Sequence, residues 1–192
     1  KFKIYNSVSE SGFSNEISGT TFSVVPSLKN IASGEYTDTT ILLHLQPGIN
    51  PVNTTYAVYE ENTGRYLNPI TGTLGSTISW GTYGDFGSTN GITITGLSPS
   101  TSYSFVAKAR NSVLVETTYS SAISVVTAPS SPKVVSATGD STSTITVVVD
   151  YTPNSTTTEM ALYENNSGMY VNPVTGILVT SAVWGDYVAY GG

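Results

Sequence analysis

The chain has 192 residues and a net charge of −6, and only 10% of its residues are charged, well below the quarter usual in soluble domains. The seven Lys and Arg never cluster, which argues against a nucleic-acid partner. Cysteine is absent, so disulfides, thiol catalysis and cysteine-bound metal are excluded. No apolar run is long enough to span a membrane, and no membrane insertion is expected.

Residues 1–22 make little sense as the start of a domain and instead match residues 106–127. The matched pairs are Lys3 and Lys108, Asn6 and Asn111, Ser7 and Ser112, Phe13 and Tyr119, Ser14 and Ser120, Ile17 and Ile123, and Ser18 and Ser124. We therefore interpret residues 1–22 as the last two strands of a preceding, partial repeat.

Residues 23–127 have the pattern of one complete β-sandwich repeat. Ile41, Leu43 and Leu45 alternate with their neighbours, as in a strand with one buried face. Further strands are predicted at residues 28–33, 56–59, 66–67, 92–95, 102–109 and 122–127, with Gly, Pro and Asn marking the turns between them. Seven or eight short strands without helical periodicity predict an all-β fold, an antiparallel β-sandwich.

Residues 128–132 form a Pro-containing linker whose two prolines favour an extended, stiff connection. Residues 133–192 then read as the first part of a following, truncated repeat. Residues 57–81 recur as residues 161–185 at an offset of 104, and 13 of these 25 positions are identical. A period of this length is that of a whole domain. The sequence therefore predicts tandem antiparallel β-sandwiches.

The segment from Gly96 to Asn111, GLSPSTSYSFVAKARN, resembles the fibronectin type III family. Members carry a Leu-x-Pro-x-Thr-x-Tyr segment leading into a strand that ends near Ala-x-Asn. The fitting positions are Leu97, Pro99, Thr101, Tyr103, Ala109 and Asn111. The resemblance implies an immunoglobulin-like sandwich in which Tyr103 packs in the core and turns its hydroxyl back to the upstream backbone. The core Trp usual in that family is replaced by Leu45 and Val149.

Aromatic residues recur at fixed spacing in the two matching segments. Trp80 and Trp184 follow an Asn-Pro-x-Thr-Gly-x-Leu loop that resembles one in multidomain bacterial or archaeal surface proteins, and we expect them to fill the core beneath that loop. The recurring tyrosines are possible contact residues for sugars or protein surfaces, since aromatic rings serve both; they are Tyr59, Tyr66, Tyr163 and Tyr170.

No catalytic, cofactor-binding or metal-binding residue is predicted, and the chain is not expected to be an enzyme. Glu60 and Glu61 beside Asn62 could bind Ca²⁺, but the second acid becomes Asn165 in the following copy. We therefore expect a turn with a solvated edge. His44 is the only histidine and becomes Val148, which argues against a ligand or general base. Sequons begin at Asn53, Asn154 and Asn165, and glycosylation there stays open.

These features predict a structural or adhesive module of an extracellular multidomain array, such as a cell-surface stalk or filament. The chain has 27 Ser and 29 Thr but few charged residues, and a polar surface made mostly of hydroxyls is common in secreted β-proteins. The expected partners are neighbouring copies of the same unit, with glycans or a host surface as further possibilities. Strand complementation between subunits is one way to join them, and a window cut from a longer array explains the ends equally well. The alternatives are a carbohydrate- or receptor-binding module, including a viral fibre, or a non-catalytic spacer of a secreted enzyme.

Overall fold

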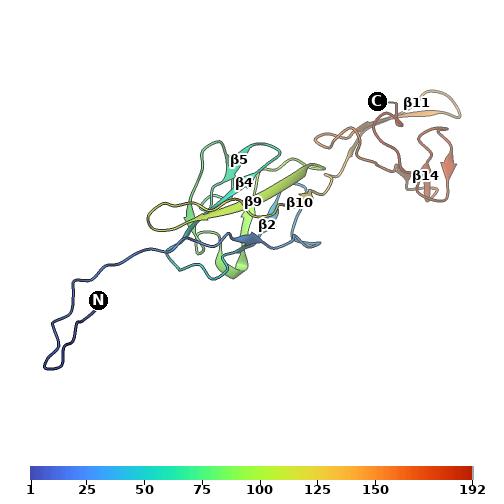
Figure 1. The fold of residues 1–192 in the computed structure, drawn as a ribbon. Helices are drawn as coiled ribbons and strands as arrows, with labels where there is room; N and C mark the ends of the chain where they lie inside the picture. Colours follow the sequence, from blue (N-terminus) through green and yellow to red (C-terminus); the bar gives the residue numbers. More distant parts are fainter. Residues whose placement is uncertain (192) are drawn as a thin grey trace.

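The computed structural model describes residues 1–191 and is nearly all β, as the sequence predicts. Three parts follow one another in space: an N-terminal arm (residues 1–22), a central sandwich (residues 23–127) and a C-terminal segment (residues 133–191) (Figure 1). The last residue of the predicted repeat 133–192 lies outside the described residues. Within residues 1–191 the one helix is a short 3-10 turn, η1 (Ser88–Asn90), and no helix could cross a membrane.

The central sandwich consists of ten strands. They are β1 (Ser27–Leu28), β2 (Ile41–Leu43), β3 (Leu45–Gln46), β4 (Thr55–Glu60), β5 (Arg65–Leu67), β6 (Leu74–Gly75), β7 (Gly81–Thr82), β8 (Ile92–Ile94), β9 (Ser102–Arg110) and β10 (Ile123–Val126). One layer is the antiparallel sheet β10-β9-β4-β5-β6, with β7 also paired to β4. In the other layer β2 and β3 are halves of one segment interrupted at His44, with β8 on one side and β1 on the other.

This two-layer arrangement is an immunoglobulin-like sandwich of the fibronectin type III kind. Its core follows the period-two alternation read from the sequence. In β9, Tyr103, Phe105, Ala107 and Ala109 are buried, whereas Lys108 lies on the outer face. The other members of the core cluster are Leu28, Ile41, Leu43, Leu45, Tyr56, Val58, Leu67, Phe86, Ile94 and Leu97.

The first strand is shorter than the predicted 28–33. Beyond Leu28 the chain enters a turn, in which the Glu35 amide donates to the Ala32 carbonyl and the Glu35 carboxylate accepts from the Ala32 amide. The Ala32 amide, followed by a Lys29 hydrogen bond, also lowers the pKa of Glu35. A side chain that captures nearby backbone in this way competes with strand pairing, and β1 therefore ends early.

The C-terminal segment consists of two small sheets. Strands β11 (Lys133–Gly139) and β12 (Ile145–Asp150) form one, and β13 (Tyr163–Glu164), β14 (Met169–Val171) and β15 (Leu178–Val179) form the other. Met160 is the one buried hydrophobic residue among the described residues of this segment. Ile145, which corresponds to the fully buried Ile41, is 69% exposed. The segment thus has strands like those of the central sandwich but no closed core.

The N-terminal arm projects from the end of the central sandwich that lies away from the C-terminal segment (Figure 1). It folds back on itself through a bridge between Tyr5 and Glu10. Its apolar side chains are open to solvent, with Phe2 and Ile4 each 72% exposed. The arm is a hairpin that packs against nothing on its apolar side.

Candidate functional site: an aromatic sheet face and an open groove

Three tyrosines pack together on the outer face of the larger sheet. Tyr59 and Tyr66 are register partners in β4 and β5, with ring centroids 4.8 Å apart. Tyr119, between β9 and β10, lies 5.9 Å from Tyr59, and its hydroxyl lies 3.4 Å from that of Tyr66. Burial, followed by the Tyr66 hydrogen bond, raises the pKa of Tyr119. The Tyr119 hydroxyl therefore stays protonated at physiological pH.

Trp80 lies outside the buried core, so the core role predicted for it is wrong. Its neighbour Gly81 pairs with the core residue Tyr56, and alternation therefore turns Trp80 to the outer face. There the Arg110 guanidinium lies 4.1 Å and the Lys108 ammonium 5.4 Å from its ring. Lys108 also lies 5.1 Å from the Tyr119 ring, so the tryptophan and the tyrosine cluster share one cation.

The core position expected for Trp80 belongs to Phe86, which is fully buried. The sequence analysis missed it, although the available signal is an aromatic residue at the same place in both segments, Phe86 and Tyr190. In the C-terminal segment Trp184 is 61% exposed, so the core prediction fails there as well.

Tyr163 and Tyr170 reproduce the Tyr59–Tyr66 pair on β13 and β14, with centroids 5.0 Å apart. The described part of the C-terminal segment has no counterpart of Tyr119, and none of Lys108 or Arg110 above Trp184. Its aromatic face is the same surface with the covering strands absent.

Tyr103 occupies the core of the central sandwich, 4% exposed, with its ring stacked 6.4 Å from Phe105. The Ser98 amide donates a 2.8 Å hydrogen bond to the Tyr103 hydroxyl. This tyrosine-corner geometry pins the segment before β9 to the core. The role is structural.

Glu60 is a fully buried carboxylate that organises the turn after β4. It accepts hydrogen bonds from the amides of Asn62 (3.2 Å), Thr63 (2.7 Å) and Ser104 (2.9 Å), and from the Thr63 hydroxyl. Desolvation is the largest single effect and would raise its pKa, but these donors outweigh it, so the pKa of Glu60 is lowered. A carboxylate already saturated by four donors holds a turn and offers no free ligand.

The remaining polar candidates form no reactive group. His44 Nε2 lies 3.4 Å from Glu35 Oε1, at the half-buried position between β2 and β3. Over residues 1–191 no three His, Cys, Asp or Glu side chains gather where they could hold a metal ion. Of the sequon asparagines, Asn53 and Asn165 are exposed, whereas the amide of Asn154 is buried and fully hydrogen-bonded. In the folded chain the side-chain nitrogen of Asn154 is therefore already engaged by the Ser130 and Tyr151 carbonyls and is not free to carry a glycan.

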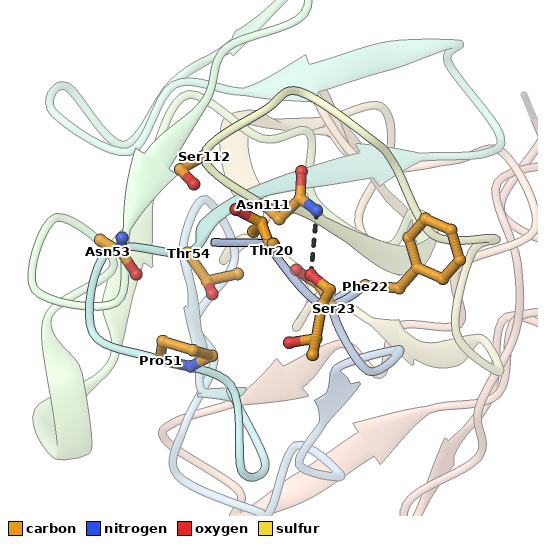
Figure 2. A pocket seen from close by; sticks show the side chains of 10 residues that line it. Thr20, Phe22, Ser23, Pro51, Asn53, Thr54, Asn111 and Ser112 are labelled. Carbon is orange, nitrogen blue, oxygen red and sulfur yellow. Dashed lines mark hydrogen bonds between the residues drawn. The ribbon is translucent and has the colours of Figure 1, made fainter. Parts of the chain in front are cut away.

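A polar cleft of about 330 Å³ lies where the arm enters the central sandwich. Figure 2 shows Thr20 and Ser23 of the entering chain facing Asn111, with Pro51 and Asn53 from the loop before β4 around the same cleft. The Asn111 side-chain amide donates to the Thr21 carbonyl at 3.0 Å. Residues 19–23 of the entering chain therefore form one wall of the cleft and are held there by Asn111.

The C-terminal segment carries an apolar groove of about 220 Å³ between its two small sheets. The side chains that line it include Val134, Val149, Met160, Leu162, Tyr163 and Tyr190. On its outer edge the backbone of Ala161 makes no hydrogen bond with any described residue. The corresponding edge of the central sandwich, along β4, is paired throughout with β9. The groove is therefore an unpaired sheet edge above an unfilled core.

Comparison with known proteins gives no family: no family model and no curated protein matches the sequence. Among solved structures, the chain is similar to a Yersinia enterocolitica family 28 exopolygalacturonase (TM-score 0.40, 17% identity), over 55% of this chain and 20% of that one. It is also similar to the fibronectin type III domain of human fibronectin type III domain containing protein 3 (TM-score 0.39, 19% identity), over 59% of this chain and 93% of that one. A redesigned β-sandwich protein matches with a TM-score of 0.31 and 25% identity, over 53% and 93%. The fold assignment depends on the strand pairing described above.

Proposed function

We propose that this chain is a non-enzymatic structural unit of an extracellular array, a cell-surface stalk or filament in which copies of one sandwich follow one another. The observation that carries the proposal is the pair of segments at residues 57–81 and 161–185, 13 of 25 positions identical at a spacing of 104. The second segment forms the same tyrosine pair and the same turn as the first. One unit repeated along a chain is the organisation of a spacer or fibre.

The connection between units supports a load-bearing role. Ser130 in the linker is hydrogen-bonded to Asp38 of the central sandwich at 2.6 Å and to Asn154 of the C-terminal segment at 2.7 Å. The Ala128 amide donates to the Thr37 carbonyl, which holds the linker's start to the sandwich. A linker tied to both neighbours transmits direction from one unit to the next.

Electron microscopy of the purified chain and of the native material tests the array. We expect rods or filaments with a regular axial repeat. Isolated globular particles in native material, at every concentration examined, would contradict a filament or stalk.

The aromatic face favours a second candidate, a carbohydrate-binding module. Tyr59, Tyr66 and Tyr119 form an aromatic surface with Tyr119 partly exposed, and such surfaces stack on sugar rings. Binding on a glycan array that disappears in the Tyr66→Ala, Tyr170→Ala double variant would favour it. Binding that survives the double substitution would remove this version of the hypothesis.

A further inference from the structure

We propose that the N-terminal arm of one chain fills the open groove in the C-terminal segment of a second copy, as an added β-strand and its return strand. Residues Phe2–Tyr5 would pair antiparallel with residues 159–162 of the acceptor, along the outer edge on which the backbone of Ala161 is unpaired. The inference deepens the proposed array and depends on it, because it names the partner that each C-terminal segment takes. Addition of a strand to an exposed sheet edge is an established mode of recognition.

The arm already has the shape of the strand pair that the acceptor lacks. In the central sandwich the Ala109 amide donates to the Thr117 hydroxyl and the Thr117 amide to the Ala109 carbonyl. In the arm the Ile4 amide donates to the Ser11 hydroxyl and the Ser11 amide to the Ile4 carbonyl. The two hairpins therefore use the same hydrogen bonds at corresponding places.

A second backbone-to-serine hydrogen bond and the contacts on the outer face also correspond in the two hairpins. The Ala107 amide donates to the Ser120 hydroxyl, as the Phe2 amide does to the Ser14 hydroxyl. Lys3 pairs with Glu10 and lies 4.6 Å from the Phe13 ring. Lys108 likewise pairs with Glu116 and lies 5.1 Å from the Tyr119 ring. The arm thus has the strand pair's outer surface as well as its backbone geometry.

The pairing of β4 with β9 fixes the register. Val58 faces Ala107, Ala57 faces Lys108 and Tyr56 faces Ala109. Carried over by the two sequence matches, the expected partners are Leu162 with Phe2, Ala161 with Lys3, and Met160 with Ile4. In this register the outward Lys3 and Tyr5 lie where Lys108 and Arg110 cover Trp80, so the arm would cover Trp184.

Side-chain sizes in arm and groove change in compensating directions. Phe2 and Ile4 stand where β9 has the fully buried Ala107 and Ala109, so a donated arm brings more volume into the core. At three core positions the acceptor has smaller residues: Val147 for Leu43, Val149 for Leu45 and Met160 for Tyr56. Leu162 is one methylene larger than Val58, so it adds no space for the arm. The extra space comes mainly from the smaller Val147 and Val149 on β12. Cores tolerate exchanges that conserve total volume.

The arm supplies counterparts of residues 106–127 only, so it does not bring the strand that pairs with Ile41 in the central sandwich, β8. The arm and the C-terminal segment that carries the groove lie at opposite ends of the molecule (Figure 1), so the arm does not reach the groove of its own chain. A head-to-tail contact of two different surfaces produces an open polymer unless its rotation closes a ring.

Sedimentation of the full chain and two variants tests the joint, the contact between the arm of one copy and the groove of the next. The wild type is expected to associate with increasing concentration. Ile4→Asp in the arm and Leu162→Asp in the groove should each weaken association by roughly a hundredfold, because each buries an uncompensated charge. Mixed together, the two variants should form a 1:1 dimer that grows no further, since the mixture retains one intact arm and one intact groove. Val8→Asp, at a hairpin tip that is 88% exposed, is the matched control and should behave as wild type.

Trp184 gives an independent reading of the same joint. In a Trp80→Phe chain its fluorescence emission should shift to shorter wavelength on assembly, and Ile4→Asp should abolish the shift. A monomeric wild type, a mixture that remains monomeric, or assembly unchanged by Ile4→Asp would overturn the joint. Filaments that persist in Ile4→Asp would leave the array intact and refute only this way of building it, whereas monomeric native material would refute the array itself.

Discussion

Asn154 brackets Ser130 through both polar backbone atoms: its side-chain oxygen accepts from the Ser130 amide at 2.7 Å, and its side-chain nitrogen donates to the Ser130 carbonyl at 2.8 Å. Asn50 makes the same pair of bonds to Val24 at the entry to the central sandwich. Each unit therefore binds the chain that leads into it with an asparagine from one loop, the loop before β4 in the central sandwich and the loop before β13 in the C-terminal segment. The direction of the linker is set by these side chains in addition to its prolines.

Replacing Asn154 by Ala should loosen this joint. The substitution leaves the amide and carbonyl of Ser130 without partners and removes one of the two donors to the Tyr151 carbonyl, a loss of about 1–2 kcal/mol. Limited proteolysis should cut the linker 128–132 several-fold faster than in wild type. Asn165→Ala is the control, because Asn165 is exposed and should change nothing. Equal cleavage of the two variants would show that the prolines alone hold the linker.

Acid should weaken the central sandwich through Glu60. The pKa of the Glu60 carboxyl is lower in the folded than in the unfolded state, so its contribution is fully present above the ordinary Glu value of about 4.3 and is lost as the pH falls through the folded value. Glu60→Gln should cost about 2 kcal/mol at neutral pH and flatten the acid side of the stability curve. Urea unfolding measured from neutral to acid pH checks both effects.

Glu61→Gln is the matched control for that experiment. Glu61 adjoins Glu60 but is exposed, and it accepts a hydrogen bond from the Ser104 hydroxyl on the surface. We expect its removal to change stability by less than about 0.5 kcal/mol. If the two variants had the same acid limb, the buried carboxylate would not be the group that titrates with unfolding.

Strand positions and buried faces in the central sandwich could be predicted because they depend on local alternation. In β9 the inward Tyr103 and Phe105 and the outward Lys108 follow from spacing alone. The position of Trp80 could not be predicted in this way. Its side of the sheet is set by the pairing of Gly81 with Tyr56, a contact across 25 residues that spacing does not encode. The tyrosine cluster could be predicted only in part, because Tyr119 joins it from the loop between β9 and β10, outside the segment 57–81 in which Tyr59 and Tyr66 recur.

Core truncation distinguishes Phe86 from Trp80. Phe86 is fully buried, so Phe86→Ala should destabilise the central sandwich by about 3–5 kcal/mol through lost burial and the cavity left behind. Trp80→Ala removes a larger side chain but only an outer-face contact with Lys108 and Arg110, and should cost about 1 kcal/mol. Thermal unfolding of both variants gives the comparison. A larger loss for Trp80→Ala would restore the tryptophan to the core.

Cysteine pairs can read the register of the joint between copies, because the chain has no cysteine of its own. Phe2 and Leu162 correspond to Ala107 and Val58, which face each other in β9 and β4 with both side chains in the core. Directly opposed residues in antiparallel strands lie about 4.5–5.5 Å apart at Cα, within the span of a disulfide. The Phe2→Cys, Leu162→Cys double variant should therefore give a ladder of covalent oligomers under mild oxidation. Lys3→Cys with Leu162→Cys is one residue out of register and puts the two thiols on opposite faces of the sheet, so it should form no covalent oligomers. A ladder from the second pair, or none from the first, would show that the arm pairs in a different register.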